Sequence, residues 1–165
     1  MNASRENPPT ASHREAIRAL YDAYFETLDD GRLEEWPEFF ADECRYRIIT
    51  RENYEAAQGL CIMQADSKGM LTDRVRAILK TQVYAPRYYR RFYSGLRVLG
   101  GTGKEWEVRQ NVLIVQTLID KPSEILGCGV GRDRVVSNAS GELKFVDRTL
   151  VFDTEMIRNS LIYPA

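Results

Sequence analysis

Residues 105–119 read EWEVRQNVLIVQTLI, and this stretch decides the fold. Its even-numbered positions are apolar or carry an amide, whereas the first odd-numbered positions are charged or polar. An alternation with a period of two is typical of a β-strand with one buried and one solvated face. From Val112 to Val115 every position is apolar, so the second half of the strand needs cover on both faces. A strand of this length exceeds the usual range, which favours a strongly curled sheet with helices against its concave side.

Three further long strands are expected to form the sheet together with this one. They cover residues 91–99, 125–136 and 143–152, which contain many β-branched and aromatic side chains. Glycine-bearing turns at residues 100–103 and 138–141 separate neighbouring strands. Because short turns of this kind join antiparallel strands, the four strands are predicted to be antiparallel neighbours.

Apolar stripes predict three helices in the first half of the chain. The first begins at Ser12, whose capping-box partner is Glu15, and ends at Gly31 in a left-handed conformation. The second covers residues 33–40 and is kept short by a proline. The third runs over residues 67–80, and Asp66 is placed to cap it. Its covered face is predicted to comprise Leu71, Val75, Ile78 and Leu79.

The remaining segments complete the expected architecture. Residues 46–50 alternate like a strand, and residues 51–65 are predicted to form a loop with a short strand near residues 60–63. Residues 84–89 are predicted to form a loop around Pro86. The predicted fold class is α+β, a cone-shaped, curled mixed or antiparallel sheet wrapped over three N-terminal helices.

Length and composition limit the class of protein. The 165 residues are expected to form a flexible N-terminal arm over residues 1–11 and a single domain over residues 12–165. The 23 basic and 24 acidic residues leave no charge bias, which argues against nucleic acid or a membrane surface as a partner. No apolar run reaches membrane-spanning length, and the N-terminus does not resemble a signal peptide. Cys44, Cys61 and Cys128 are scattered and odd in number, which indicates reduced thiols in a cytoplasmic protein.

The single histidine, His13, restricts the metal chemistry of this chain. A Rieske cluster takes two histidines and two cysteines, and a facial-triad iron takes two histidines and a carboxylate. Catalytic zinc usually takes two or three histidines. The chain cannot assemble any of these sites alone, and His13 is expected to be solvated in the first turn of a helix.

Two groups of residues on the predicted strands each share one face of their strand. Gly127, Gly129 and Gly131 share one face of a strand, and no helix N-terminus follows them as a phosphate loop requires. The interpretation is that these glycines let the sheet bend or a neighbour approach closely. Gln110 and Gln116 are expected either to line a cavity inside the cone or to bond to helix ends packed there.

The last residues, 153–165, are unusually apolar for a chain end that follows the final strand. Such a segment is expected to dock, either on its own domain or on a partner.

Four segments together resemble a known family. They are LEEWPEFFADECRY (residues 33–46), DSKGMLTDR (residues 66–74), RRFYSGLRV (residues 90–98) and RTLVFDTEMIRNSLIY (residues 148–163). In this order and spacing they resemble the small (β) subunits of Rieske-type aromatic-ring-hydroxylating oxygenases, over nearly the whole chain after residue 12. The first, second and last segments are most similar to subunits acting on aromatic acids, such as those of salicylate 5-hydroxylase and terephthalate dioxygenase. The third differs from many members, with Arg91 in place of a histidine and Gly95 in place of an asparagine.

The resemblance implies the cone fold of nuclear transport factor 2 and a non-catalytic role. In this family the large α subunit holds the Rieske 2Fe-2S cluster, the mononuclear iron and the substrate pocket. The small subunit supports it in an α3β3 hexamer, and electrons come from NADH through a reductase and often a ferredoxin. The resemblance therefore implies no catalytic, cofactor-binding or metal-binding residue in this chain, and an aromatic, carboxylated substrate for the complex. The expected interface residues are Arg91, Tyr93, Arg97, Ile157, Tyr163 and Pro164.

Two alternatives remain at this point. One is a stand-alone isomerase or dehydratase of the same fold, since one fold supports many functions. That enzyme needs a titratable group with a shifted pKa on the inner face of the sheet, where the sequence offers mostly glutamine and apolar residues. The other is a homodimeric binding or scaffold module without an iron-bearing partner.

Overall fold

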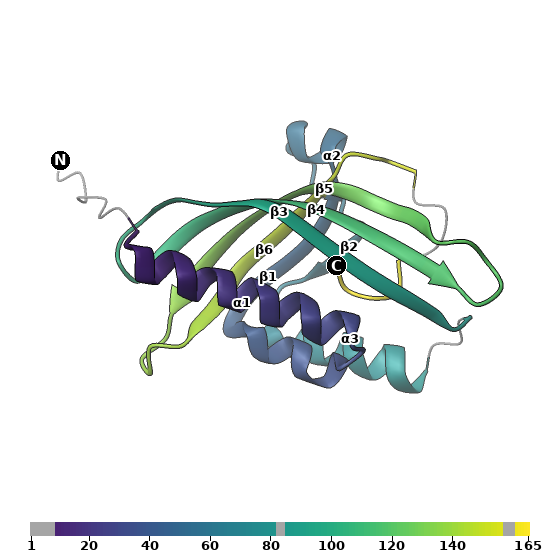
Figure 1. The fold of residues 1–165 in the computed structure, drawn as a ribbon, viewed down its shortest axis with the longest axis horizontal. Helices are drawn as coiled ribbons and strands as arrows, with labels where there is room; N and C mark the ends of the chain where they lie inside the picture. The colour runs from purple at the N-terminus through teal and green to yellow at the C-terminus, as the bar shows by residue number, and fades with distance from the viewer. Residues whose placement is uncertain (1–8, 82–84, 157–160) are drawn as a thin grey trace.

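The architecture is a single curled sheet over helices, as the sequence predicts. The structure, a computed structural model, describes residues 9–81, 85–156 and 161–165. Helices α1 (Ala11–Asp29) and α3 (Lys68–Lys80) lie along one side of the sheet, and the short α2 (Arg51–Glu55) lies on the other (Figure 1). The 3-10 helix η1 (Leu33–Phe39) connects α1 to the first strand. None of the helices in the described segments is long and apolar enough to span a bilayer.

Six strands form the sheet in the order β2-β1-β6-β5-β4-β3. They are β1 (Phe40–Thr50), β2 (Met63–Ala65), β3 (Arg87–Gly101), β4 (Glu105–Leu118), β5 (Glu124–Ser137) and β6 (Leu143–Phe152). Strands β3 to β6 are antiparallel neighbours, as predicted. The early strand β1 pairs parallel with the last strand β6, so the sheet is mixed.

The first helix has its cap at Thr10, two residues earlier than the predicted Ser12. The side chain of Thr10 accepts from the backbone N–H of His13 at 3.2 Å, and the Thr10 N–H donates to His13 Nδ1 at 3.4 Å. The predicted Ser12–Glu15 capping box is therefore wrong, because a threonine already holds the extended cap conformation before Ala11. His13 was expected to be solvated, but its ring lies 4.9 Å from the ring of Trp106.

The third helix is capped by Ser67 and not by Asp66. Ser67 stands directly before the first helical residue, and its Oγ accepts from the Met70 N–H at 3.3 Å. Asp66 instead accepts from Gln64 Nε2 at 2.8 Å. The predicted covered face is confirmed at three positions, whereas the fourth, Leu79, is 48% exposed. The buried positions are Leu71, Val75 and Ile78.

The segment over residues 51–65 contains more structure than predicted. Thr50 Oγ1 accepts from the Asn53 N–H at 3.3 Å and thereby caps α2, which the sequence analysis treated as loop. The short strand lies at Met63–Ala65, later than residues 60–63, because Met63 pairs with Ile48 of β1. At the next loop, β3 already begins at Arg87.

The three glycines of β5 allow close approach of neighbouring groups, as interpreted from the sequence. A Cβ atom added at Gly129 would lie 2.0 Å from the carbonyl oxygen of Val151 in β6. At Gly131 it would lie 2.8 Å from Nε2 of Gln110. The backbone and side-chain positions around β5 therefore depend on the missing side chains.

The apolar tail docks on its own domain over residues 161–165. The Ala165 N–H donates to the Tyr46 hydroxyl at 2.8 Å, and the Tyr24 hydroxyl donates to the Ala165 carbonyl at 2.9 Å. Arg91 Nη2 donates to the Pro164 carbonyl at 2.5 Å. These contacts hold residues 164 and 165 against α1, β1 and β3. Ile157 lies outside the described residues.

Candidate functional site

The concave side of the sheet is filled by a buried ion pair surrounded by aromatic rings. Arg148 of β6 lies 2.7 Å from Oδ2 of Asp133 on β5, and both residues are at most 3% exposed. The Tyr21 hydroxyl of α1 donates to the same oxygen at 2.6 Å, and the Thr149 N–H donates to Oδ1 at 3.2 Å. The guanidinium also lies 4.2 Å from the centroid of the Tyr24 ring, a cation–π distance.

This cluster corrects the expectation that the inner face carries mainly glutamine and apolar residues. Asp133 follows Gly131 by two positions, so the alternation of β5 already placed it on the inner face. Gln110 and Gln116 do point inward, but Gln110 Nε2 contacts Asp133 Oδ2 at 3.5 Å. Gln116 Oε1 accepts from Arg87 at 3.2 Å. Among the described residues, neither glutamine bonds to a helix end, and Gln110 belongs to the buried cluster.

Burial controls the protonation of this cluster. It raises the pKa of Asp133 above the ordinary value, although Arg148, Tyr21 and the Thr149 N–H favour the carboxylate. Burial and the Asp133 carboxylate raise the pKa of Tyr21 well above its ordinary value. Burial has the largest single effect and lowers the pKa of Arg148, but Asp133 together with Tyr24, Tyr21 and Tyr46 outweighs it, so the net pKa is raised. A carboxylate that is held by four donors and shielded from solvent is suited to a structural role, because a general acid or base must reach a substrate.

The outer face of the sheet carries a row of arginines. The backbone register places Arg97 opposite Arg109, Arg109 opposite Arg132, and Thr149 opposite both Arg132 and Arg47. We call Arg47, Arg97, Arg109 and Arg132 the arginine row. Arg47 Nη2 donates to Thr149 Oγ1 at 3.0 Å, and Arg132 lies 5.5 Å from the ring of Tyr54. Within the described parts of the chain, none of the four has a carboxylate partner.

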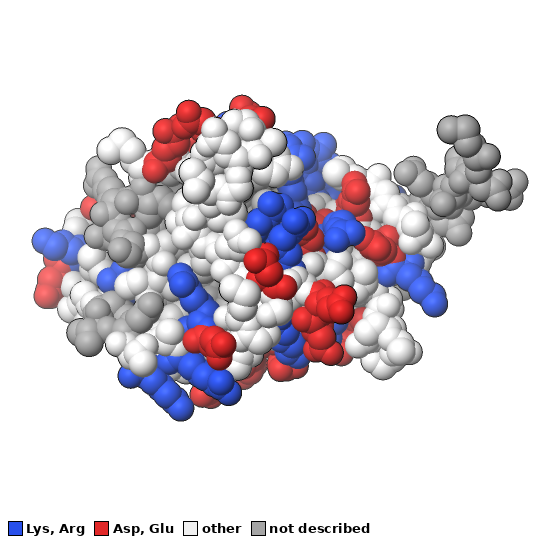
Figure 2. All heavy atoms as spheres, turned by 180° about the vertical axis from the view of Figure 1, so that it is seen from behind, with Lys and Arg blue, Asp and Glu red and all other residues white. Residues whose placement is uncertain are grey.

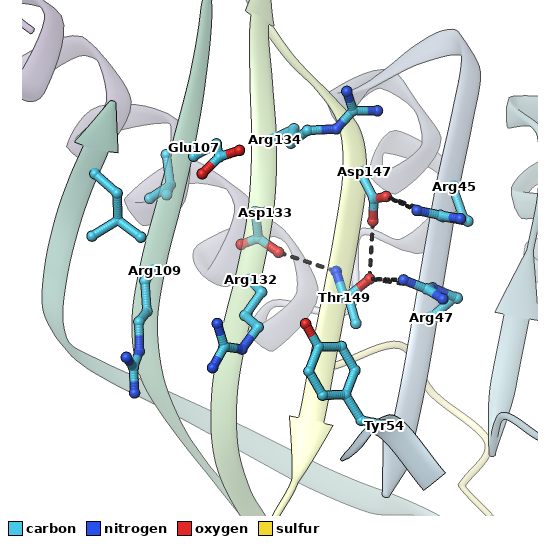
Figure 3. A pocket seen from close by; sticks show the side chains of 12 residues that line it. Arg45, Arg47, Tyr54, Glu107, Arg109, Arg132, Asp133, Arg134, Asp147 and Thr149 are labelled. Carbon is cyan, nitrogen blue, oxygen red and sulfur yellow. Dashed lines mark hydrogen bonds and ion pairs between the residues drawn. The ribbon is translucent and has the colours of Figure 1, made fainter. Parts of the chain in front are cut away.

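The next row of the same face is balanced in charge. Its register places Glu107 opposite Arg134, Arg134 opposite Asp147, and Asp147 opposite Arg45. Arg45 forms an ion pair with Asp147, and Arg134 forms one with Glu105 at 2.9 Å. Between the two rows lies an open pocket of about 330 Å³, in which Arg109 and Arg132 point the same way (Figure 3). Of these two rows, only the arginine row carries arginines without acidic partners among the described residues.

An apolar strip lies beside the arginine row on the outer face. Phe92, Leu113 and Cys128 are opposite one another on β3, β4 and β5. Phe92 is 56% exposed, and Leu99, at the other end of β3, is 57% exposed. Seen from behind, basic and acidic side chains lie intermingled next to a broad uncharged area (Figure 2). Large exposed apolar side chains of this kind mark interaction surfaces.

The expected interface residues fall into two groups in the structure. Arg97 is exposed on the outer face, within the arginine row. The Arg91 side chain is buried, where it pairs with Asp29 at 2.6 Å and holds the tail at Pro164. Tyr93 and Tyr163 are partly buried; Tyr93 donates to Asp22, and the Tyr163 ring lies 5.1 Å from that of Tyr89. Arg47, Arg109, Arg132 and Phe92 also lie on the outer face and are not among the expected interface residues, although the alternation of β4 placed Arg109 on the solvated face.

The chain does not offer the ligands of a Rieske cluster. Among the described residues, no group of three or more His, Cys, Asp and Glu side chains is arranged to hold a metal ion. His13 is the single histidine of the sequence, and its ring contacts Trp106. Burial raises the pKa of the Cys44 thiol to about 11, which disfavours the thiolate that metals bind. Since a Rieske centre needs two histidines, the residues present do not fit one.

Comparisons of the sequence and of the structure with known proteins both find small subunits of ring-hydroxylating dioxygenases. A family model described as "Ring hydroxylating beta subunit" matches residues 24–159. The small subunit of anthranilate 1,2-dioxygenase from Burkholderia cepacia is 30% identical over 90% of this chain and 91% of that protein. Subunit beta 1 of the terephthalate 1,2-dioxygenase terminal oxygenase component from Comamonas sp is 26% identical, over 90% and 96%. Among solved structures, the β subunit of a provisionally assigned aromatic-ring-hydroxylating dioxygenase from Novosphingobium aromaticivorans has a TM-score of 0.84 and 32% identity, over 92% of this chain and 95% of that one.

Proposed function

This chain belongs to the family of ring-hydroxylating β subunits, and from that membership we propose that it is the non-catalytic small subunit of an aromatic-ring-hydroxylating oxygenase. The observation that carries the proposal is the family match over residues 24–159. The filled cone supports it, because Asp133 and Arg148 occupy the place where a stand-alone enzyme of this fold needs a substrate cavity. The isomerase or dehydratase alternative is therefore less supported.

The proposed complex has its chemistry in the partner. A large α subunit would hold the Rieske 2Fe-2S cluster, the mononuclear iron and the substrate, which we propose to be an aromatic carboxylate, as anthranilate and terephthalate are in the names of the relatives. We propose an α3β3 hexamer that receives electrons from a reductase, with or without a ferredoxin. Three free cysteines support a cytoplasmic location.

This subunit would contribute a rigid surface. The buried ion pair and the docked tail hold the curled sheet in one shape, and the outer face presents Arg97, Phe92 and Leu99 to a partner. Arg91 and Pro164 would act from inside, by fixing the tail on which Tyr163 is carried. We propose that Tyr93, Tyr163 and Ile157 also lie near the interface.

Co-purification tests the proposed function. The chain is tagged in its native host, and the expected result is a brown, iron-containing larger subunit in equal ratio, with a Rieske absorption spectrum. Recovery of a colourless chain alone would contradict the proposal and would direct assays to isomerase and dehydratase chemistry.

Arg97→Glu is expected to weaken the hexamer while leaving the circular dichroism spectrum unchanged. Arg76→Glu, on the exposed side of α3, is the matched control and should leave the hexamer intact.

A further inference from the structure

The arginine row is unfavourable for the isolated chain. Side chains directly opposite each other on antiparallel strands have Cβ atoms about 5 Å apart, and like charges in such pairs are destabilising. Two such pairs follow one another here, Arg97 with Arg109 and Arg109 with Arg132. In the neighbouring row the same geometry pairs arginine with acid. The contrast points to an acidic group from outside the described part of the chain.

The central arginine of the row lacks an acceptor that its burial calls for. Nε of Arg109 is shielded from solvent, and no hydrogen-bond partner for it exists among the described residues. A buried donor without an acceptor is unfavourable, and a donor that carries charge is more so. A carboxylate placed between Arg109 and Arg132 would accept from the first and neutralise both.

The length of the row shows what kind of ligand fits. Neighbouring strands are about 4.8 Å apart, so Arg97 to Arg132 spans about 10 Å and Arg97 to Arg47 spans about 19 Å. A single small anion binds one or two guanidinium groups, so it would leave the rest of the row uncompensated. A protein segment with several carboxylates matches the full span. Exposed Phe92 and Leu99 on the same face add the apolar contacts that protein interfaces use and that a polyphosphate chain does not need.

We infer that the arginine row binds an acidic segment of the α subunit, with carboxylates seated between Arg97 and Arg109 and between Arg109 and Arg132. This inference rests on the proposed function and names the chemistry by which the partner is recognised. The arginine row would then lower the stability of the free chain and raise the affinity of the complex. Removing arginines relieves repulsion in the free chain and removes contacts in the complex, whereas residues with a merely structural role would lose stability in both.

The test uses the double variant Arg109→Gln/Arg132→Gln. Its dissociation constant for the purified α subunit is expected to rise at least about tenfold at 50 mM NaCl, and the difference should shrink at 500 mM NaCl as charges are screened. The melting temperature of the free variant should equal or exceed that of the parent. Arg134→Gln, which removes an arginine with an acidic partner on the same face, and Arg76→Gln, on α3, are the matched controls. An unchanged dissociation constant at both salt concentrations, or a lower melting temperature, overturns the inference.

A second measurement separates this inference from the proposed function. The free chain is titrated with a fluorescent octaglutamate peptide, with inorganic phosphate and a single-stranded oligonucleotide as competitors. Salt-sensitive peptide binding that the double variant loses supports carboxylate recognition, even if the parent chain fails to bind an α subunit and the proposed function falls. Tighter binding of the oligonucleotide, or no peptide binding, overturns recognition of an acidic segment. Self-association of the parent chain that the double variant abolishes would assign the row to a second copy and overturn the α subunit as its occupant.

Discussion

The Arg148 side chain holds together several elements in the interior of the cone. Its guanidinium is 1% exposed and lies over the Tyr24 ring while it pairs with Asp133. Desolvating both charges is unfavourable, so the pair is a weak source of stability compared with an apolar core. Its effect is geometric, because it joins β5 and β6 to Tyr21 of α1.

Removing the cation alone should be severely destabilising. We expect Arg148→Met to lower the free energy of unfolding by about 3–5 kcal/mol, because Asp133 is left buried without its partner. The double variant with Asp133→Asn should recover part of that loss in urea unfolding at pH 7. Burial already holds the pKa of Asp133 above its ordinary value, so the folded single variant keeps a proton that the unfolded chain releases. Its stability should therefore fall as pH rises from about 4 towards 7. A pH-independent loss, or a double variant that is no more stable than the single one, would contradict this account.

Tyr93 should make stability depend on alkaline pH. Burial and the hydrogen bond to Asp22 raise its pKa to about 12 from 10.0. The folded state therefore keeps the phenol proton longer, so this contribution to stability is complete below pH 10 and is lost as pH rises towards 12. Tyr93→Phe should flatten the fall in melting temperature over that range. Tyr88→Phe, on the exposed outer face, is the matched control and should behave as the parent. Equal slopes for the parent and Tyr93→Phe would show that another group is responsible.

At the scale of the element, β5 is the strand on which the sheet depends. It pairs with β4 on one side and β6 on the other, and Gly129 lies where the β6 backbone comes closest. It also contributes Asp133 to the inner cluster and Arg132 to the arginine row, since successive residues of a strand point to opposite faces. A change in the register of β5 would exchange these two residues between the faces.

Gly129→Ala should therefore be destabilising. The added Cβ would lie 2.0 Å from the Val151 carbonyl oxygen, which belongs to the backbone and cannot move without shifting β6. We expect the free energy of unfolding to fall by about 1–3 kcal/mol, as for other overpacked sites. Gly59→Ala is the matched control, because its Cβ would meet no atom within 4 Å. Equal urea midpoints for the two variants would refute the close approach.

Local patterns in the sequence predicted most elements, and long-range contacts account for the differences. The alternation over residues 105–119 identified β4, because successive side chains of a strand point to opposite faces even where the sheet is curled. The alternation of β4 placed Arg109 on the solvated face, but Arg97 could not be aligned with it, because bulges between Ser94 and Arg97 and between Val98 and Gly100 change the phase of β3. Arg91 was expected at a surface and is buried, since Asp29 and Pro164, both distant in sequence, supply its partners.

At the scale of the whole molecule, residues 161–165 at the end of the chain pack against the core of the domain. Residues 161–165 bring together groups from α1, β1 and β3, through Tyr24, Tyr46 and Arg91. Burial raises the pKa of the Tyr46 hydroxyl, which stays protonated and both donates and accepts at the tail. The tail is thus part of the core and not an appendage.

Deleting residues 161–165 should lower the free energy of unfolding by about 3 kcal/mol or more, since buried hydrogen-bonding groups lose their partners. Arg91→Gln should lower it by less, because it removes the contacts with Pro164 and Asp29 only. Combining the two should give less than the sum, as expected for residues that share a contact. Urea unfolding of the three variants checks this. Strict additivity would mean that Arg91 and the tail act independently.

The parallel pairing of β1 with β6 has a consequence for synthesis of the protein on the ribosome. Arg45 and its partner Asp147 are 102 residues apart in sequence. At about 5–20 residues per second, β1 leaves the ribosome roughly 5–20 s before the strand that lies beside it in the finished sheet. During that interval β1 can pair with β2 but not with β6, so Ile48 and Ile49, which are buried in the folded protein, lack the strand on their other side. The sheet is therefore completed only after β6 has left the ribosome, and any partner that recognises the complete outer face must bind after that point.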